Sequence, residues 1–112
     1  MAEKILPFNK DPNWVTDILT TRGRSVSYED TNFIVGDSPV VLDVNTDLGR
    51  NGRDGYIAVD TGSISVEISD NGTDYGGVHS IHTGEILKLN GVDIDSIRLT
   101  WIENASYRVF CI

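Results

Sequence analysis

Short runs in which apolar and polar residues alternate fill the chain from about residue 24 to the C-terminus. In segment 63–69 every second position holds isoleucine or valine, and segment 97–101 repeats the pattern with Ile97, Leu99 and Trp101. Successive side chains of a β-strand point to opposite faces of its sheet. Both segments therefore predict strands with one buried face, and Trp101 is expected in the core beside the two aliphatic residues.

Further segments of this kind, with turn residues between them, predict an all-β domain. Asn71-Gly72 favours a tight hairpin turn, because Asn-Gly tolerates positive φ angles, and a second turn is expected at Asn90-Gly91. A long loop is expected over residues 45–54. About eight short strands with no helix between them predict an antiparallel β-sandwich or a jelly-roll-like barrel. The strand candidates are 25–28, 32–35, 39–44, 56–60, 63–69, 78–82, 84–89, 97–101 and 107–112.

The first 23 residues differ in character and are expected to form an N-terminal arm. Residues 5–8 are apolar but interrupted by a proline, which suits an extended segment. Asp11 and Pro12 suit the N-cap and first position of a helix of one or two turns. Because so short a helix is not stable alone, its apolar face must pack on something. The sequence thus predicts an arm over residues 1–23 and a β-sandwich domain over residues 24–112.

Length, charge and cysteine content narrow the class of protein. A chain of 112 residues is long enough for one domain with its own core. The apolar runs are too short for a membrane-spanning helix, and the N-terminus lacks a Sec signal pattern, so synthesis in a cytoplasm is expected.

Nine basic and seventeen acidic residues give a net charge of −8, which argues against a nucleic-acid partner. Cys111 lies in an apolar run and is expected to be a core residue.

Residues 43–54 carry oxygen-bearing side chains at a spacing that resembles an EF-hand-like calcium loop. The weak candidate ligands are Asp43, Asn45, Asp47, Asn51 and Asp54. A leucine stands where the turn glycine belongs, an aspartate replaces the bidentate glutamate, and no flanking helix is expected. Because Asn, Asp and Gly also fill ordinary β-loops, a structured loop without metal is the favoured interpretation.

Other candidate chemistry is sparse. His79 and His82, three apart on a predicted strand, point to opposite faces and are not expected to share a metal ion. The chain has no nucleophile motif, no phosphate-binding glycine loop and no zinc spacing, so we expect no enzymatic activity and no cofactor. Tyr75 follows a predicted hairpin tip and is the best candidate for a surface contact, including stacking on a sugar ring. A carbohydrate- or receptor-binding sandwich is therefore the alternative function.

Three segments resemble small β-rich virion structural proteins of tailed bacteriophages. They are Ile68–Gly76, Thr83–Leu87 and Ile94–Thr100, and together they span roughly the C-terminal half of the chain. That group includes capsid decoration (cement) proteins and the attachment domains of head fibres. The resemblance implies an N-terminal arm that lies along the capsid and adds a strand or an apolar plug to its neighbour, while the compact domain projects outward.

The sequence and the resemblance together predict a non-enzymatic structural protein of a phage virion, assembled in the host cytoplasm. We expect a capsid decoration protein that binds the major capsid protein or another virion protein. A tail, neck or baseplate component is a further alternative. A homo-oligomer is expected, with a trimer favoured, and neither nucleic acid nor membrane is expected as a partner. In the arm, the expected contact residues are Ile5, Leu6, Phe8, Trp14, Ile18 and Leu19. The arm could instead fold back on its own domain.

Overall fold

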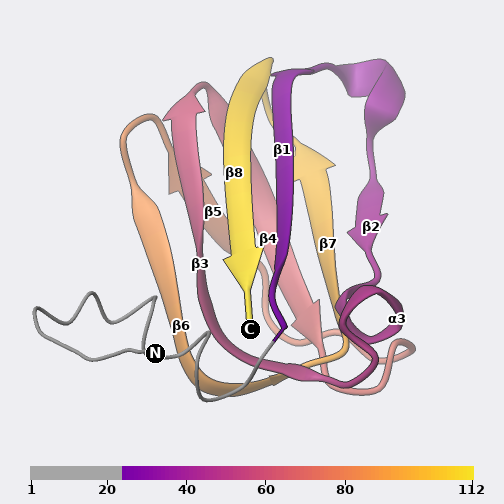
Figure 1. The fold of residues 1–112 in the computed structure, drawn as a ribbon. Coiled ribbons are helices and arrows are strands. Elements are labelled where there is room, and N and C mark those ends of the chain that lie inside the picture. Colours follow the sequence, from indigo (N-terminus) through magenta and orange to yellow (C-terminus); the bar gives the residue numbers. More distant parts are fainter. Residues whose placement is uncertain (1–23) are drawn as a thin grey trace, which may run out of the picture.

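The computed structural model describes residues 24–112, which form two four-stranded antiparallel sheets packed face to face (Figure 1). The first sheet has the strand order β1-β8-β3-β6 and the second the order β2-β7-β4-β5. The strands are β1 (Val26–Phe33), β2 (Val40–Leu42), β3 (Gly52–Thr61), β4 (Ser63–Ser69), β5 (His79–His82), β6 (Ile86–Ile94), β7 (Ser96–Trp101) and β8 (Ala105–Cys111). The short helices are η1 (Val35–Asp37) and α3 (Val44–Leu48).

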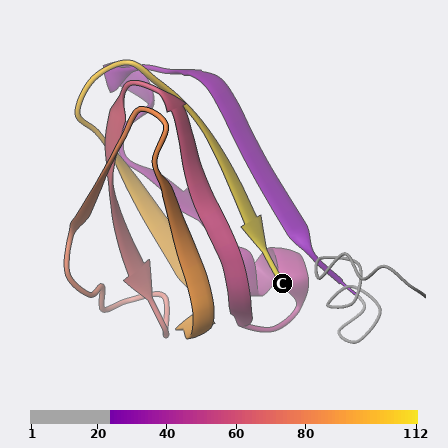
Figure 2. The same ribbon diagram turned by 90° about the vertical axis from the view of Figure 1, so that its left-hand side faces the viewer.

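Strand pairing is nested along the sequence. β1 pairs with β8, β2 with β7, β3 with β6 and β4 with β5. The chain thus rolls up around its central β4–β5 pair, which is the jelly-roll arrangement. Both sheets stay open, with β1 and β6 as the edges of the first sheet (Figure 2). The predicted all-β antiparallel sandwich is confirmed, and the fold is not a closed barrel.

The core lies between the sheets and consists of the apolar positions that alternate along the strands. Ile64 and Val66 of β4 are 0% and 1% exposed, and Leu99 of β7 is 0% exposed, as the alternation predicts. Trp101 is only half-buried and packs against the edge of this core. Its indole Nε1 donates a hydrogen bond to Asn104 Oδ1 at 3.0 Å, which requires the ring edge to reach the surface.

Two turns expected from Asn-Gly pairs differ in the structure. β6 continues through Asn90-Gly91 to Ile94, and the pairing with β3 shifts register there instead of turning. The Asn71-Gly72 turn belongs to a wide loop, residues 70–78, rather than to a tight hairpin. In that loop Ser69 Oγ accepts from the Gly72 N–H at 2.8 Å. An isolated antiparallel bridge between Ser69 and Tyr75 closes the base of this turn, with the Gly76 N–H donating to the Ile68 carbonyl oxygen at 3.0 Å, and the side-chain hydrogen bonds add to this backbone pairing.

A helix stands where a long loop was expected. The Asp43 carboxylate accepts from the Thr46 N–H at 3.2 Å and caps α3, whose Val44 and Leu48 are both buried. These two residues are four apart, so they lie on one face of the helix. The strand candidates at 25–28 and 32–35 also prove to be one strand, β1, with an irregular register near its end. No helix within residues 24–112 is long and apolar enough to cross a membrane.

Candidate functional sites

The chain enters the sandwich through a hydrogen-bonded clamp beside α3. Arg24 Nη2 donates to the Asp47 carbonyl oxygen at 2.7 Å, and Arg50 Nη2 donates to the Arg24 carbonyl oxygen at 3.4 Å. The Tyr28 hydroxyl donates to Asp47 Oδ2 at 2.5 Å. We term these four residues the root clamp. It holds the point at which residues 1–23 join the domain.

The Tyr28 hydroxyl stays protonated within this clamp. Burial, followed by the hydrogen bond to Asp47, raises the pKa of Tyr28 well above its ordinary value. A raised pKa keeps the neutral form, which is the form able to donate to a carboxylate. The clamp therefore keeps its tyrosine donor throughout the neutral pH range.

Asn51 ties together three segments at the same end of the sandwich. Its Oδ1 accepts from Asn45 Nδ2 at 2.7 Å, and its Nδ2 donates to the Asp70 carbonyl oxygen at 3.1 Å and to Asp93 Oδ1 at 3.0 Å. One amide thus uses its acceptor and both donors. It joins α3, the 70–78 loop and the end of β6.

The five weak calcium candidates are engaged in separate protein contacts. Asp43 caps α3, Asp47 belongs to the root clamp, Asn45 and Asn51 bond to each other, and Asp54 accepts from the β6 backbone. The structure does not bring the five side chains to one point. Within residues 24–112, no group of three or more His, Cys, Asp or Glu side chains is arranged to hold a metal ion.

Ser63, His82 and Glu103 form a hydrogen-bonded chain that the sequence did not indicate. Ser63 Oγ lies 2.9 Å from His82 Nδ1 and donates to Glu103 Oε2 at 2.8 Å. In a nucleophilic triad the imidazole stands between hydroxyl and carboxylate. Here the buried Ser63 hydroxyl stands in the middle and donates its hydrogen bond to the carboxylate. The arrangement joins β4, β5 and the β7–β8 turn, and His79 takes no part in it.

Tyr75 packs against the outer face of the second sheet. The guanidinium carbon of Arg98 lies 4.1 Å from the centroid of the Tyr75 ring, and Arg98 Nε donates to Glu67 Oε1 at 2.8 Å. One face of the ring is therefore covered by a cation that Glu67 holds in place. The role of Tyr75 as a surface contact stays a prediction.

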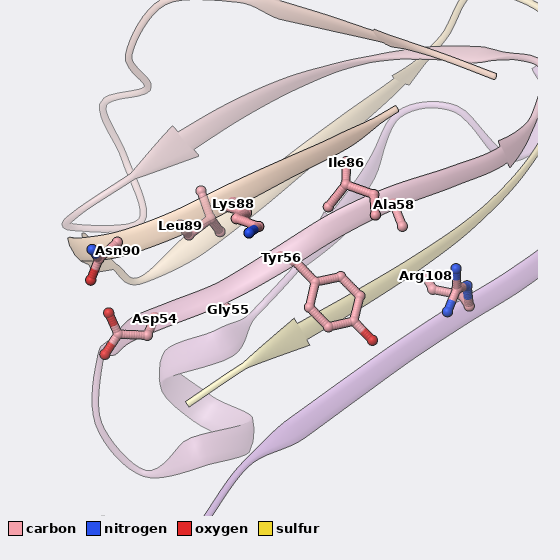
Figure 3. A pocket seen from close by; sticks show the side chains of 9 residues that line it. All are labelled: Asp54, Gly55, Tyr56, Ala58, Ile86, Lys88, Leu89, Asn90 and Arg108. Atoms are coloured by element: carbon pink, nitrogen blue, oxygen red, sulfur yellow. The ribbon is translucent and has the colours of Figure 1, made fainter. Parts of the chain in front are cut away.

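A hollow of about 500 Å³ opens on the outer face of the first sheet (Figure 3). Its lining comes from β3, β6 and β8 and consists of Asp54, Gly55, Tyr56, Ala58, Ile86, Lys88, Leu89, Asn90 and Arg108. The strand register places Tyr56 between Lys88 on one side and Phe110 on the other. The Tyr56 and Phe110 rings lie 5.9 Å apart and 22° from parallel.

Sequence reasoning did not find this hollow. Residues 56–60 look like one apolar run, although Ile57 and Val59 point into the core while Tyr56 and Asp60 share the opposite parity. That parity was the available signal. It does not reveal which strands lie beside β3, and the hollow depends on those neighbours.

The proposed arm contacts lie outside the described residues, so their role stays a prediction. They are Ile5, Leu6, Phe8, Trp14, Ile18 and Leu19.

Cys111 is fully buried, and burial raises the pKa of its thiol to about 12. Its predicted place in the core is confirmed.

The fold and these sites define a jelly-roll β-sandwich with a clamped N-terminal root and a hollow on one outer face. Comparison with protein-family models, curated proteins and solved structures returned no match for this chain.

Proposed function

We propose that this chain is a non-enzymatic structural protein of a phage virion, of the capsid decoration type. Residues 1–23 attach it to the lattice of the major capsid protein, and the sandwich projects from the particle. The chain associates with copies of itself, most simply as a trimer around a symmetry axis. The proposal starts from the resemblance of segments 68–76, 83–87 and 94–100 to such proteins.

The root clamp is the observation that carries the proposal. An attachment segment sets the position of its domain only when the junction between them is fixed. Arg24 is held through both its guanidinium group and its carbonyl oxygen, by Asp47 in α3 and by Arg50 just after it. Tyr28 adds a third contact to the same helix. A junction held in this way supports an arm that orients a rigid body.

The fold supports the proposal at a coarser level. Jelly rolls recur in viral capsid proteins and in lectin domains. A shared fold is an argument by analogy, because one fold serves many functions. It agrees with a virion role and does not separate capsid decoration from other virion components.

A binding assay with full-length protein tests the proposal. Recombinant chain is mixed with purified phage particles that lack it, and co-sedimentation is measured against protein concentration. The arm variant carries Phe8→Ser and Trp14→Ser, and the matched control carries Val41→Ser and Val78→Ser, two exposed valines of the domain (53% and 65% exposed). We expect saturable binding by wild type and control, and a loss of at least about tenfold in affinity for the arm variant, because tenfold corresponds to only about 1.4 kcal/mol.

Cryo-electron microscopy of the decorated particles supplies the second readout. Density for the sandwich at regular positions on the capsid lattice is expected. Loosening the clamp with Arg24→Ala and Arg50→Ala should leave binding intact while the density of the domain weakens. Unchanged binding by the arm variant would refute the attachment role of residues 1–23. Absence of saturable binding by wild type, or density on the tail alone, would refute the decoration assignment.

A further inference from the structure

The side chains that line the hollow on the first sheet form three rungs, each a row of cross-strand neighbours on β6, β3 and β8. The rungs are Asn90 with Asp54; Lys88 with Tyr56 and Phe110; and Ile86 with Ala58 and Arg108. The middle rung carries the aromatic rings, and the short, buried Ala58 side chain lines the hollow at the next rung. In Figure 3 the Tyr56 ring lies along the sheet, with Asp54 and Asn90 toward one end and Arg108 toward the other.

The aromatic pair extends one apolar surface across two strands. Tyr56 and Phe110 are both half-buried, and their rings lie within 22° of parallel. Burying the exposed part of such rings against another apolar surface is favourable. Ile86, 57% exposed at the next rung, widens the apolar area.

Polar groups around these rings have unused hydrogen-bonding capacity. Within residues 24–112, the Tyr56 hydroxyl, the Lys88 ammonium group and the side-chain amide of Asn90 make no hydrogen bond. Arg108 donates from Nε and Nη2 to the Asp60 carboxylate at 3.0 and 3.1 Å. That pairing fixes the guanidinium plane and leaves three of its five N–H groups for another acceptor.

The hollow carries charges of both signs, although the domain as a whole is acidic. Residues 24–112 contain fourteen acidic and six basic side chains. At the hollow, Lys88 and Arg108 stand near Asp54, Asp60 and Glu29, and Asp60 and Glu29 both act on Arg108. The site has no excess of positive charge to attract a polyanion.

The backbone along the floor of the hollow is already paired, and the open edge of the edge strand β6 lies at its border. β3 lies between β8 and β6, so its N–H and C=O groups are engaged on both sides. A peptide that binds by adding a strand needs a free edge, which the floor of the hollow does not provide. The ligand must instead combine an apolar face for the rings with many groups that both donate and accept hydrogen bonds.

We propose that this hollow binds an uncharged saccharide. A pyranose has an apolar C–H face, which packs on Tyr56 and Phe110, and a rim of hydroxyls, each a donor and an acceptor. Asn90, Lys88 and the free N–H groups of Arg108 bind those hydroxyls. The volume of about 500 Å³ lies within the range typical of small-ligand sites. The site is independent of residues 1–23 and of their attachment to a capsid.

Nuclear magnetic resonance of the full chain tests the site. Uniformly ¹⁵N-labelled protein is titrated with neutral oligosaccharides of glucose, galactose, mannose and N-acetylglucosamine, and in parallel with uronic-acid oligosaccharides. We expect at least one neutral sugar to give saturable shifts at the amides of residues 54–58, 86–90 and 108–110. A shallow, open site of this kind predicts a dissociation constant of roughly 0.1–1 mM.

Variants decide which residues hold the sugar. Tyr56→Ala should weaken binding by at least about tenfold, and Tyr56→Trp should retain it, because an aromatic face is kept. Tyr75→Ala is the matched control on the other sheet and should change affinity by less than about twofold. Asn90→Ala removes an exposed amide without touching the core and should weaken binding severalfold. It keeps the test valid if Tyr56→Ala fails to fold.

Several results would overturn the proposal. They are absence of saturable binding by any neutral sugar, binding restricted to uronic acids, shifts centred on Tyr75 and Arg98, and unchanged affinity in Asn90→Ala together with a folded Tyr56→Ala. Shifts of the same amides on raising the protein concentration alone would assign the hollow to a second copy of the chain. None of these results bears on co-sedimentation with phage particles, so the two proposals fail separately.

Discussion

The crossing from β3 to β4 offers a matched pair of substitutions. Gly62 makes this crossing at φ +77°, and Gly84 makes the turn before β6 at φ +81°. A Cβ added at Gly62 would stand 2.0 Å from the Asn104 carbonyl oxygen and 2.7 Å from Ala105 Cα, whereas one added at Gly84 meets nothing within 4 Å. The variants Gly62→Ala and Gly84→Ala therefore share their backbone strain and differ in the clash with the backbone of Asn104 and Ala105.

The magnitudes follow from these distances. Alanine in a left-handed conformation costs about 1–2 kcal/mol, offset by about 0.4–1 kcal/mol because alanine restricts the unfolded chain. Gly84→Ala should thus lower the free energy of unfolding by about 1 kcal/mol. At Gly62 the new Cβ must move about 1 Å or more to reach an ordinary contact, and backbone atoms cannot rotate away, which adds about 2 kcal/mol. Gly62→Ala should lower the free energy of unfolding by about 3 kcal/mol.

Urea unfolding, followed by tryptophan fluorescence and by circular dichroism, measures both variants. For a domain of this size the free energy changes by about 1–2 kcal/mol per molar urea, so the two midpoints should differ by about 1–2 M. Coincident transitions by the two probes establish two-state behaviour. A Gly62→Ala chain that is unfolded beside a folded Gly84→Ala would be a stronger form of the same result. Equal midpoints would show that a Cβ at position 62 does not clash with the backbone of the β7–β8 turn.

Three further predictions concern the core, the thiol and the Asn51 network. Leu99→Ala, at a fully buried position, should lower the free energy of unfolding by about 2–5 kcal/mol, while Val41→Ala, 53% exposed on the adjacent strand, should change it by less than about 0.5 kcal/mol in the same urea assay. Because burial raises the pKa of the Cys111 thiol from 9.0 to about 12, the folded state keeps a proton that the unfolded state loses. Stability is therefore full below pH 9 and falls by about 1 kcal/mol by pH 10, and denaturation of Cys111→Ala should show a flatter pH dependence over this interval. Asn51→Asp should place a second carboxylate against Asp93 and remove a donor, lowering the melting temperature at pH 7 and lowering it less at pH 4; a pH-independent loss would contradict this account.

The fold was predictable where a strand separates core from solvent. Apolar and polar residues alternate along β4 and β7, and the apolar residues face the core, so this pattern is legible in the sequence. The predictions from the sequence were wrong where the same residues suit two kinds of local structure. Asn90-Gly91 suits a turn, but the same backbone freedom serves a register shift within β6. Asp43 suits a loop, yet it caps α3, a helix too short to show periodicity.

The sites were less predictable, because they depend on which strands are neighbours. The root clamp joins Arg24 to Asp47, 23 positions away, and the hollow joins β3 to both β6 and β8. The parity of Tyr56 was visible in the sequence. Its neighbours Lys88 and Phe110 were not, because nested pairing brings together segments that lie more than 30 residues apart. Alternation predicts which way a side chain faces and says nothing about what stands beside it.

The nested pairing also sets the order of events during synthesis. β8 stands between β1 and β3, so the first sheet lacks an interior strand until residues 105–111 have left the ribosome. Before that moment β1 has no partner, and β3 can pair only with β6. Folding of the described domain therefore waits for β8 and is governed by long-range closure, which is slow. A nascent chain stalled before Ala105 exposes two unpaired strand edges, and it should depend on chaperones or on neighbouring chains to avoid aggregation.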